Sequence, residues 1–294
     1  MTSAATGKTI SPSDYEQFRV FLERNCGIML GDNKHYLISS RLHHLLAEYA
    51  VSSLGELVKR AEQGSHSGLQ ERIIDAMTTN ETLWFRDIQP YEALKHQILP
   101  ELAQRQGCAP RIWSAACSSG QEPYSISMVV QEYLQNKPGA FPRGVQIIAT
   151  DISPTMLKEA AAGVYDGISL SRGLSLERRE RFFTSKAGDA SAKRLGMEKW
   201  EIKKEIKNRV TFKELNLMKS YAALGKFDVI FCRNVLIYFS GALKRDIIAR
   251  LTQTLNPHGY LILGASESLA NHSDAFDMLR YASTVVYRLK TESK

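Results

Sequence analysis

The first quarter of the chain carries its apolar residues at the spacing of amphipathic helices. Apolar side chains recur every three to four positions, as at Phe18 and Leu22, which predicts a helix with one buried face. Ser11, followed by proline, suits the start of that helix, and Gly27 suits its end. The same spacing predicts three further helices, at about 34–49, 54–61 and 69–77. We therefore expect an all-helical domain over residues 10–77.

A different pattern begins at residue 111, where a short apolar run precedes small residues and then helical spacing. Trp113 lies in the apolar run, residues 114–119 are all small, and Gly120 follows them. This order predicts a strand, a tight loop and a helix, with Pro123 in the first helical turn. Small residues before a helix let a ligand approach the positive helix end, which favours a nucleotide-type site. With a single glycine, an ordinary strand-to-helix turn is an equally compatible interpretation.

Polar residues follow three of the predicted strands at the point where each strand ends. Asp151 ends the second strand, and Asn216 and Asn234 come directly after the two strands further along the chain. Open α/β sheets bind ligands at the carboxyl ends of their strands, and an acidic residue after the second strand holds ribose hydroxyls in dinucleotide-type folds. We therefore expect these three side chains to share one ligand-binding rim.

Residues 171–209 interrupt the α/β rhythm. The run MEKWEIKKEIKN alternates Trp and Ile with Lys and Glu, and this period of two predicts antiparallel strands in a small inserted subdomain. A core strand is expected to resume at 210–215. The formal net charge of +7 is concentrated in residues 171–213. A solvated face explains such a charge run, and no nucleic-acid partner is expected because neither interleaved aromatics nor a nucleic-acid motif accompanies it.

The composition narrows the class of protein. A chain of 294 residues fits one large domain or two modest ones. No apolar run approaches the ~20 residues of a membrane span, and residues 1–10 lack the apolar region of a signal peptide. The cysteines form no C-x-x-C and have no histidines at metal spacing, so we expect neither disulfides nor a metal site. These features favour a cytoplasmic protein. The four cysteines are Cys26, Cys108, Cys117 and Cys232.

Two polar segments leave alternatives open. Residues 78–87, TTNETLWFRD, place short polar groups beside large aromatics; they fit an interdomain linker with buried aromatics or a lid over a ligand. The predicted second helix carries Lys34, Arg41 and His44 opposite its apolar face. That face is either a solvated surface or a docking face for an acidic helix.

Several motifs stand in order along the chain: TTNET…FR, WSAACSSGQEPYSISM, ATDIS, Asn216-Leu217 and FDVIFCRNVLIYF. Together they resemble the CheR family of chemotaxis receptor methyltransferases over nearly the whole chain. The resemblance implies an α/β protein in which a small all-helical domain precedes a Rossmann-like methyltransferase domain with an inserted antiparallel β-subdomain. It implies a cytoplasmic enzyme that uses S-adenosylmethionine to methylate glutamate side chains of methyl-accepting chemotaxis receptors. The domains would be 10–77, a linker at 78–90 that contributes to the cofactor site, and 91–294 with the insertion at about 171–209.

The resemblance also implies roles for individual residues. Arg86 and Tyr238 would be catalytic, with Tyr238 beside the transferred methyl group. The basic face of the second helix would read the receptor's methylation region through Lys34, Arg41 and His44. The cofactor would be bound by Asn80, Thr82, Arg86, Glu122, Asp151, Asn216, Leu217, Arg233, Asn234 and Val235.

One segment departs from the family pattern. Family members that bind a receptor's C-terminal pentapeptide carry a short turn containing glycine in the β-subdomain, whereas residues 184–198 here are longer and rich in Lys and Ala. We therefore expect no tethering to a receptor tail, and we expect a monomer. Alternative functions are methylation of another carboxylate or of RNA, and cofactor sensing without transfer. A nicotinamide enzyme is disfavoured because the phosphate-binding glycines are absent.

Overall fold

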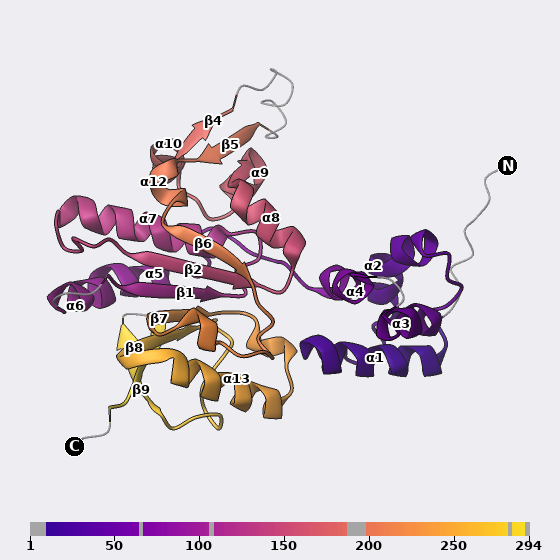
Figure 1. The fold of residues 1–294 in the computed structure, drawn as a ribbon. Helices are drawn as coiled ribbons and strands as arrows, with labels where there is room; N and C mark the ends of the chain where they lie inside the picture. Colours follow the sequence, from indigo (N-terminus) through magenta and orange to yellow (C-terminus); the bar gives the residue numbers. More distant parts are fainter. Residues whose placement is uncertain (1–9, 65–66, 106–108, 187–197, 282–283, 292–294) are drawn as a thin grey trace. The chain divides into compact units, whose positions relative to one another are not determined.

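The protein is described here from a computed structural model that covers residues 10–291 except 65–66, 106–108, 187–197 and 282–283. Its backbone divides into two compact units (Figure 1). The first comprises Met1–Thr79 together with Tyr238–Leu243, and the second comprises Asn80–Ile237 together with Lys244–Lys294.

The first unit is built from helices, as the apolar spacing predicted. They are α1 (Pro12–Cys26), α2 (His35–Glu48), α3 (Leu54–Glu62) and α4 (Leu69–Met77). The Ser11 side chain accepts a hydrogen bond from the N–H of Asp14, and Gly27 ends α1 with a φ of 74°, as expected for an N-cap and a left-handed C-cap. Phe18, Leu22 and their counterparts on the other helices are buried. The predicted helices are thus confirmed.

The second unit contains a large sheet that has seven strands among the described residues, in the order β6-β2-β1-β7-β8-β10-β9. The strands from β6 to β8 run parallel, and β10 is antiparallel to both of its neighbours. The strands are β1 (Arg111–Ala115), β2 (Gln146–Asp151), β6 (Val210–Glu214), β7 (Phe227–Cys232), β8 (Leu255–Leu263), β9 (Phe276–Tyr281) and β10 (Thr284–Leu289).

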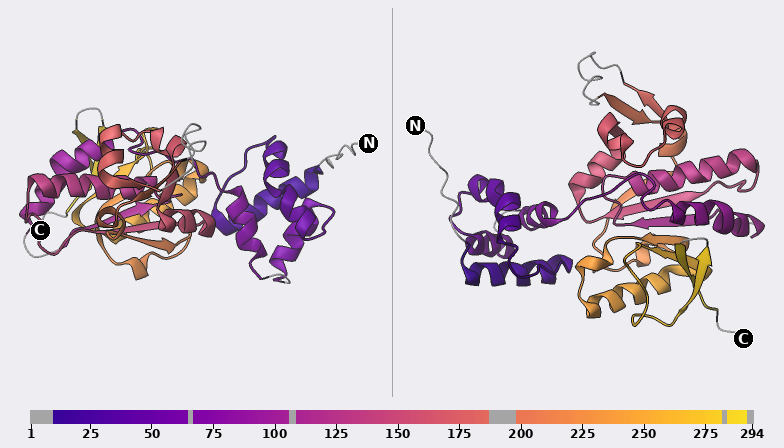
Figure 2. Two further views of the ribbon diagram at one scale, coloured as in Figure 1. Left: turned by 90° about the horizontal axis from the view of Figure 1, so that it is seen from above. Right: turned by 180° about the vertical axis from the view of Figure 1, so that it is seen from behind.

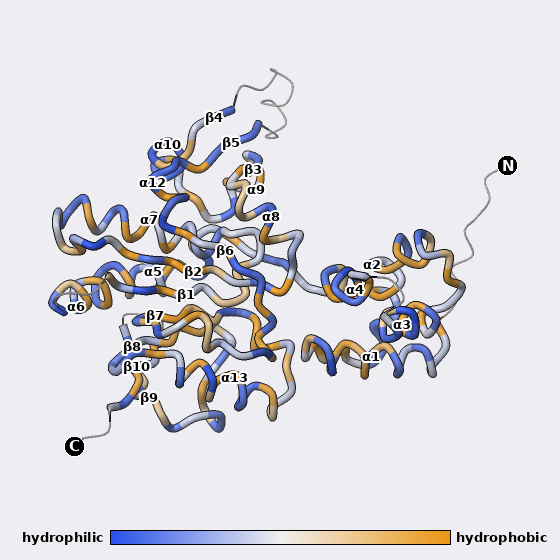
Figure 3. Tube along the Cα trace, viewed as in Figure 1, coloured by the Kyte–Doolittle hydropathy of each residue, from blue (hydrophilic) through white to orange (hydrophobic). Residues whose placement is uncertain are grey.

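The strand order reverses direction beside β1. The chain passes from β1 to β2 and β6 on one side, and then returns to β7 on the other side. Such a switch point opens a crevice at the carboxyl ends of the strands, where open α/β sheets bind ligands. Figure 3 shows hydrophobic residues along the central strands, and Ile112, Trp113 and Phe231 are fully buried there. The α/β fold class is confirmed, and the switch point lies at the carboxyl ends of β1, β2 and β7.

Helices pack on this sheet and carry the connections. Helix α7 packs against β2 and β6, and α8 packs against the same two strands. The helical segments are α5 (Gln89–Ala93), the π-helical turn η1 (Leu94–Ile98), α6 (Leu99–Gln104), α7 (Gln121–Asn136), α8 (Pro154–Ala162), the 3-10 turns η2 (Ala222–Leu224) and η3 (Leu236–Tyr238), and α13 (Gly241–Thr254). None of the helices in the described part of the chain is long and apolar enough to cross a membrane.

A small antiparallel sheet forms in the region where the rhythm breaks. Its described strands are β3 (Val164–Asp166), β4 (Phe183–Ser185) and β5 (Lys199–Ile202), in the order β3-β5-β4. The short helices α9 (Gly167–Ser171), α10 (Leu176–Phe182) and α12 (Lys204–Lys207) accompany it. Figures 1 and 2 show this sheet beyond the β6 edge of the large sheet.

The antiparallel character was predicted, but three local features differ from the sequence interpretation. The sheet takes its first strand from Val164–Asp166, ahead of residue 171, and Lys204–Lys207 is helical rather than extended. Strand β6 is an edge strand with Thr211 and Lys213 exposed, and not a core strand. The alternating pattern led us to extend the strand too far. Strand β5 has four residues, and the helical turn that follows it, Lys204–Lys207, continues the pattern because it has one apolar residue among charged ones.

Glu132 on α7 binds two cations and thereby joins three elements. Its carboxylate accepts hydrogen bonds from Lys95 Nζ and Arg178 Nε, both at 2.7 Å. Burial alone would raise the pKa of Glu132, but the bonds from Arg178 and Lys95 lower it overall. The two ion pairs of Glu132 therefore stabilise the folded state at neutral pH.

Glu132→Gln is expected to lower the free energy of unfolding by about 1–3 kcal/mol at neutral pH, because two partly buried cations lose their counter-charge. Since the folded-state pKa lies below the unfolded value, the stabilisation is present above the unfolded pKa and is lost as pH falls through the folded pKa. Urea unfolding of both proteins should show their difference shrinking in acid. Glu92→Gln is the control, because the Glu92 side chain is 42% exposed and pairs with His96; an equal loss there would contradict the prediction.

Candidate active site

The loop between β1 and α7 has a fixed, strained backbone at the carboxyl end of the sheet. Ala116 and Ser118 have φ values of 61° and 49°, which L residues adopt only at a cost. The N–H of Cys117 donates to the carbonyl of Thr150 at 2.9 Å. Gly120 follows with a φ of 94°, and a Cβ there would lie 2.9 Å from the Ala160 Cβ, so only glycine fits. The predicted tight loop is therefore present and is anchored to β2.

Asp151 binds this loop through its side chain. Its buried carboxylate accepts from the N–H of Ser118 at 2.7 Å and from the N–H of Ser153 at 2.9 Å. Ser118 in turn donates its hydroxyl to the carbonyl of Asn80 at 3.0 Å, and the N–H of Leu215 donates to the Asp151 carbonyl at 2.9 Å. The structure thus brings together the segments that contain Asn80, Asp151 and Asn216.

A buried cluster of charged groups lies next to the same loop. Glu122, in the first turn of α7, accepts from the Ser114 hydroxyl at 2.7 Å and from Arg233 at 3.2 Å. Arg233 also donates to the Asp87 carboxylate at 2.6 Å and to the Arg86 carbonyl at 2.8 Å. Burial raises the pKa of Glu122, although Arg233 and Ser114 act in the opposite direction. Arg233 therefore joins α7 to the 86–87 segment.

The segment that carries Arg86 is held by its aromatic neighbours. The ring of Trp84 is buried against Tyr165 and Phe183, with ring centroids 4.9 and 5.4 Å apart. The N–H of Phe85 donates to the Ser125 hydroxyl at 3.1 Å. Arg86 itself is only partly buried and donates to the Glu81 carbonyl at 3.2 Å. The aromatic side chains of this segment are thus buried, as expected of a linker, while Arg86 lies partly exposed.

The remaining predicted cofactor residues lie on the loops after β6 and β7. The Asn216 side chain accepts from the N–H of Met218 at 2.9 Å, and Leu217 is buried. Asn234 adopts a φ of 58°, and it and Val235 are partly exposed. Thr82 is also partly exposed. These placements leave the predicted roles in cofactor binding as predictions.

Four predicted site residues belong to the first unit. The carbonyl of Tyr238 accepts from the N–H of Met29 at 2.9 Å. Lys34, directly before α2, and His44 on α2 are exposed. Arg41 is different, because it donates to the carbonyls of Met77 and Thr78 at 2.7 Å each. Arg41 therefore caps the end of α4 and is less available to a partner than the other two.

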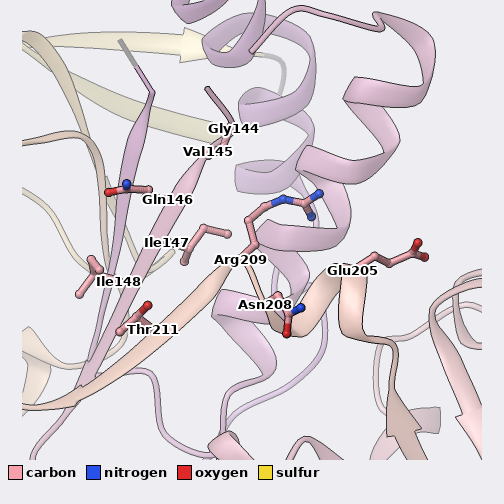
Figure 4. Close-up of a pocket in the computed structure, with 9 residues that line it drawn as sticks. All are labelled: Gly144, Val145, Gln146, Ile147, Ile148, Glu205, Asn208, Arg209 and Thr211. Carbon is pink, nitrogen blue, oxygen red and sulfur yellow. The ribbon is translucent and has the colours of Figure 1, made fainter. Parts of the chain in front are cut away.

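The hollow drawn in Figure 4 lies away from these groups. It has a volume of about 520 Å³ and is lined by residues that include Gln146 at the start of β2. Asp151 ends the same strand, so the hollow opens at the opposite end. Arg209, which also lines it, donates to Ser127 and Gln131. Within the described ranges, no group of three or more His, Cys, Asp or Glu side chains could hold a metal ion.

Sequence comparisons identify the family. A model described as CheR methyltransferase, SAM binding domain, matches residues 80–285, and one described as CheR methyltransferase, all-alpha domain, matches residues 13–78. The chain belongs to the CheR methyltransferase family. A relative named chemotaxis protein methyltransferase 1, from Pseudomonas aeruginosa, is 53% identical and covers 95% of this chain and 98% of its own length. The chemotaxis protein methyltransferase of Escherichia coli is 32% identical and covers 92% of this chain and 89% of its own length.

The polar groups at this site of the CheR protein fit S-adenosylmethionine. A carboxylate accepts hydrogen bonds from ribose hydroxyls, and Asp151 presents one next to the positive end of α7. The loop before α7 is made of small residues. Sequence reasoning missed Asp87, which binds Arg233, because nothing in the spacing of these residues indicates the contact.

Proposed function

We propose that this CheR protein transfers a methyl group from S-adenosylmethionine to glutamate side chains of methyl-accepting chemotaxis receptors. The products are glutamate methyl esters and S-adenosylhomocysteine. The observation that carries the proposal is the network joining Asn80, Ser118 and Asp151 at the sheet's switch point, in a chain that matches the SAM binding domain of its family over residues 80–285.

Each residue's proposed role follows from its chemistry and its position. S-adenosylmethionine supplies, when bound, a methyl group on a positively charged sulfur. Asp151 accepts from the ribose hydroxyls, and Asn216 and Leu217 contact the adenine. Glu122 faces the methionine part, with Arg233 balancing its charge. The other proposed cofactor contacts are Asn80, Thr82, Arg86, Asn234 and Val235.

The substrate needs no general base. A glutamate side chain with a pKa near ~4.3 is already ionised at neutral pH, so the enzyme has to orient the carboxylate and remove part of its water. Arg86 holds one carboxylate with its planar guanidinium. Tyr238 is the second proposed catalytic residue, as a hydrogen-bond donor to the substrate. Lys34, directly before α2, and Arg41 and His44 on α2 contact the receptor. We take the enzyme to be monomeric and cytoplasmic, and the described cysteines, which are free, suit a reducing compartment.

The test is methyl incorporation from labelled S-adenosylmethionine into receptor-containing membranes. We expect label on the receptor that is released by mild base, as is typical of carboxyl methyl esters. Label on RNA or on a small carboxylic acid would favour the alternative substrates. Tight binding of the cofactor without any transfer would contradict the proposal and would indicate a sensing module.

The proposed enzyme does not tether itself to a receptor tail. Residues 184–198, which depart from the tethering pattern, lie mostly outside the described residues. Calorimetry with an aromatic-ended receptor tail peptide is expected to show weak or no binding, because residues 184–198 are longer than the short glycine-containing turn of the tethering pattern and are rich in Lys and Ala. Micromolar affinity would contradict this expectation, and the measurement needs the same peptide with its aromatics replaced by alanine as the control.

A further inference from the structure

One carboxylate outside the predicted site binds the backbone of a loop inside it. The side chain of Glu267 accepts four main-chain N–H groups, those of Asn234 at 2.7 Å, Gly264 at 2.9 Å, Val235 at 3.0 Å and Ile237 at 3.3 Å. One oxygen serves Asn234 and Gly264, and the other serves Val235 and Ile237. A carboxylate has about four acceptor positions, so Glu267 is saturated by these bonds.

The loop that Glu267 holds comprises residues 233–237, which follow the carboxyl end of β7 and include the start of the 3-10 turn η3. Its backbone is irregular at Asn234, which has a φ of 58°. Such a turn leaves successive N–H groups pointing the same way, and without an acceptor these groups would be costly to bury. Hydrogen bonds to a charged acceptor are also stronger than neutral ones. The carboxylate of Glu267 therefore accepts the hydrogen bonds that keep this loop in one conformation.

The space around the carboxylate is filled on its other side. A Cβ on Gly264 would lie 2.8 Å from the Asn234 side-chain nitrogen and 2.8 Å from a carboxylate oxygen of Glu267. Gly264 directly follows β8 (Leu255–Leu263), the strand beside β7. The end of one strand thus holds the loop after its neighbour, with no room for a side chain between them.

We infer that Glu267 is a positioning residue that holds the 233–237 loop in the conformation needed to bind S-adenosylmethionine. The inference rests on the proposed role of Asn234 and Val235 in cofactor binding. The hydrogen bonds that Glu267 accepts from the described residues come from main-chain N–H groups, so it acts through the loop. Without Glu267 the loop adopts several conformations, and only a fraction of the molecules have the one that binds the cofactor. The apparent affinity for the cofactor is then reduced in proportion to that fraction.

Glu267→Gln is expected to weaken binding of S-adenosylmethionine and S-adenosylhomocysteine by about 10- to 100-fold, because an amide nitrogen replaces one acceptor and faces N–H donors. Calorimetry measures the affinities, and steady-state methylation should show a raised KM for S-adenosylmethionine with an unchanged KM for receptor. Asp277→Asn is the matched control, since that exposed carboxylate of the same unit loses the same charge.

Two further variants keep the test decisive if Glu267→Gln fails to fold. Glu267→Asp retains the charge but is too short to reach both pairs of N–H groups, and Gly264→Ala pushes on the loop from the other side. Both should raise the KM for the cofactor. Wild-type affinity in the folded variants, or a lower kcat with an unchanged KM, would overturn the inference. Absence of cofactor binding by the unmodified protein would instead contradict the proposed function.

Discussion

Replacing Arg86 by alanine is expected to lower the rate of methyl transfer by about 10²- to 10³-fold at saturating S-adenosylmethionine. Arg86 lies on a segment whose neighbouring aromatics are buried, while its own guanidinium is partly exposed. The side chain is therefore carried by a fixed backbone and can bind a substrate carboxylate in a defined orientation. Single-turnover transfer to receptor-containing membranes measures the effect.

Two variants separate a role in orientation from a role of charge alone. Arg86→Lys keeps the charge but loses the planar pair of donors, so we expect it to recover only part of the rate. Arg280→Ala removes an exposed arginine of the same unit and should leave the rate unchanged. Near-normal turnover in a folded Arg86→Ala protein would remove Arg86 from the mechanism.

Replacing Arg233 by methionine is expected to lower the free energy of unfolding of the second unit by about 3–5 kcal/mol. The Arg233 side chain is 1% exposed, and its partner Glu122 is 11% exposed, so the change leaves a carboxylate buried without its counter-charge. Asp87 is 39% exposed, and water compensates for much of its loss. Urea unfolding measures the free energy, and Arg245→Met, at an exposed position on α13, is the control.

The pH dependence identifies Glu122 as the cause. Burial already raises the pKa of Glu122, and without Arg233 the pKa rises further. A carboxyl group with a raised pKa binds more protons in the folded state, so stability increases as pH falls through that pKa. The defect of Arg233→Met should therefore shrink in mild acid, and Glu122→Gln in the same background should reduce it at neutral pH. A defect that is independent of pH and of Glu122 would point to lost packing.

The periodic segments were predictable because their pattern depends only on neighbouring residues. The spacing of apolar side chains gave α1 (Pro12–Cys26) nearly to the residue, since capping residues flank this helix. The apolar runs of β1, β2 and β7 were equally clear, because central parallel strands are buried on both faces.

Short elements were not predictable in the same way. Strand β3 has three residues, too few to show a period of two, and its pairing with β5 depends on a segment more than thirty positions away in the printed sequence. Strand β9 was missed because most of its residues are exposed or only partly buried, as an edge strand's are. In both cases long-range pairing supplies the stability that local pattern does not reveal.

The sequence by itself determined the helical first domain, the α/β character of the second, and the arrival of Asp151, Asn216 and Asn234 at strand ends. Each of these depends on local spacing and on the shared direction of parallel strands. Only the tertiary structure decided that Arg233 binds Glu122 and Asp87, and that Glu267 holds the loop after β7. Those contacts join residues about 30 to 150 positions apart, and no local preference of the chain specifies which distant donor a buried carboxylate meets.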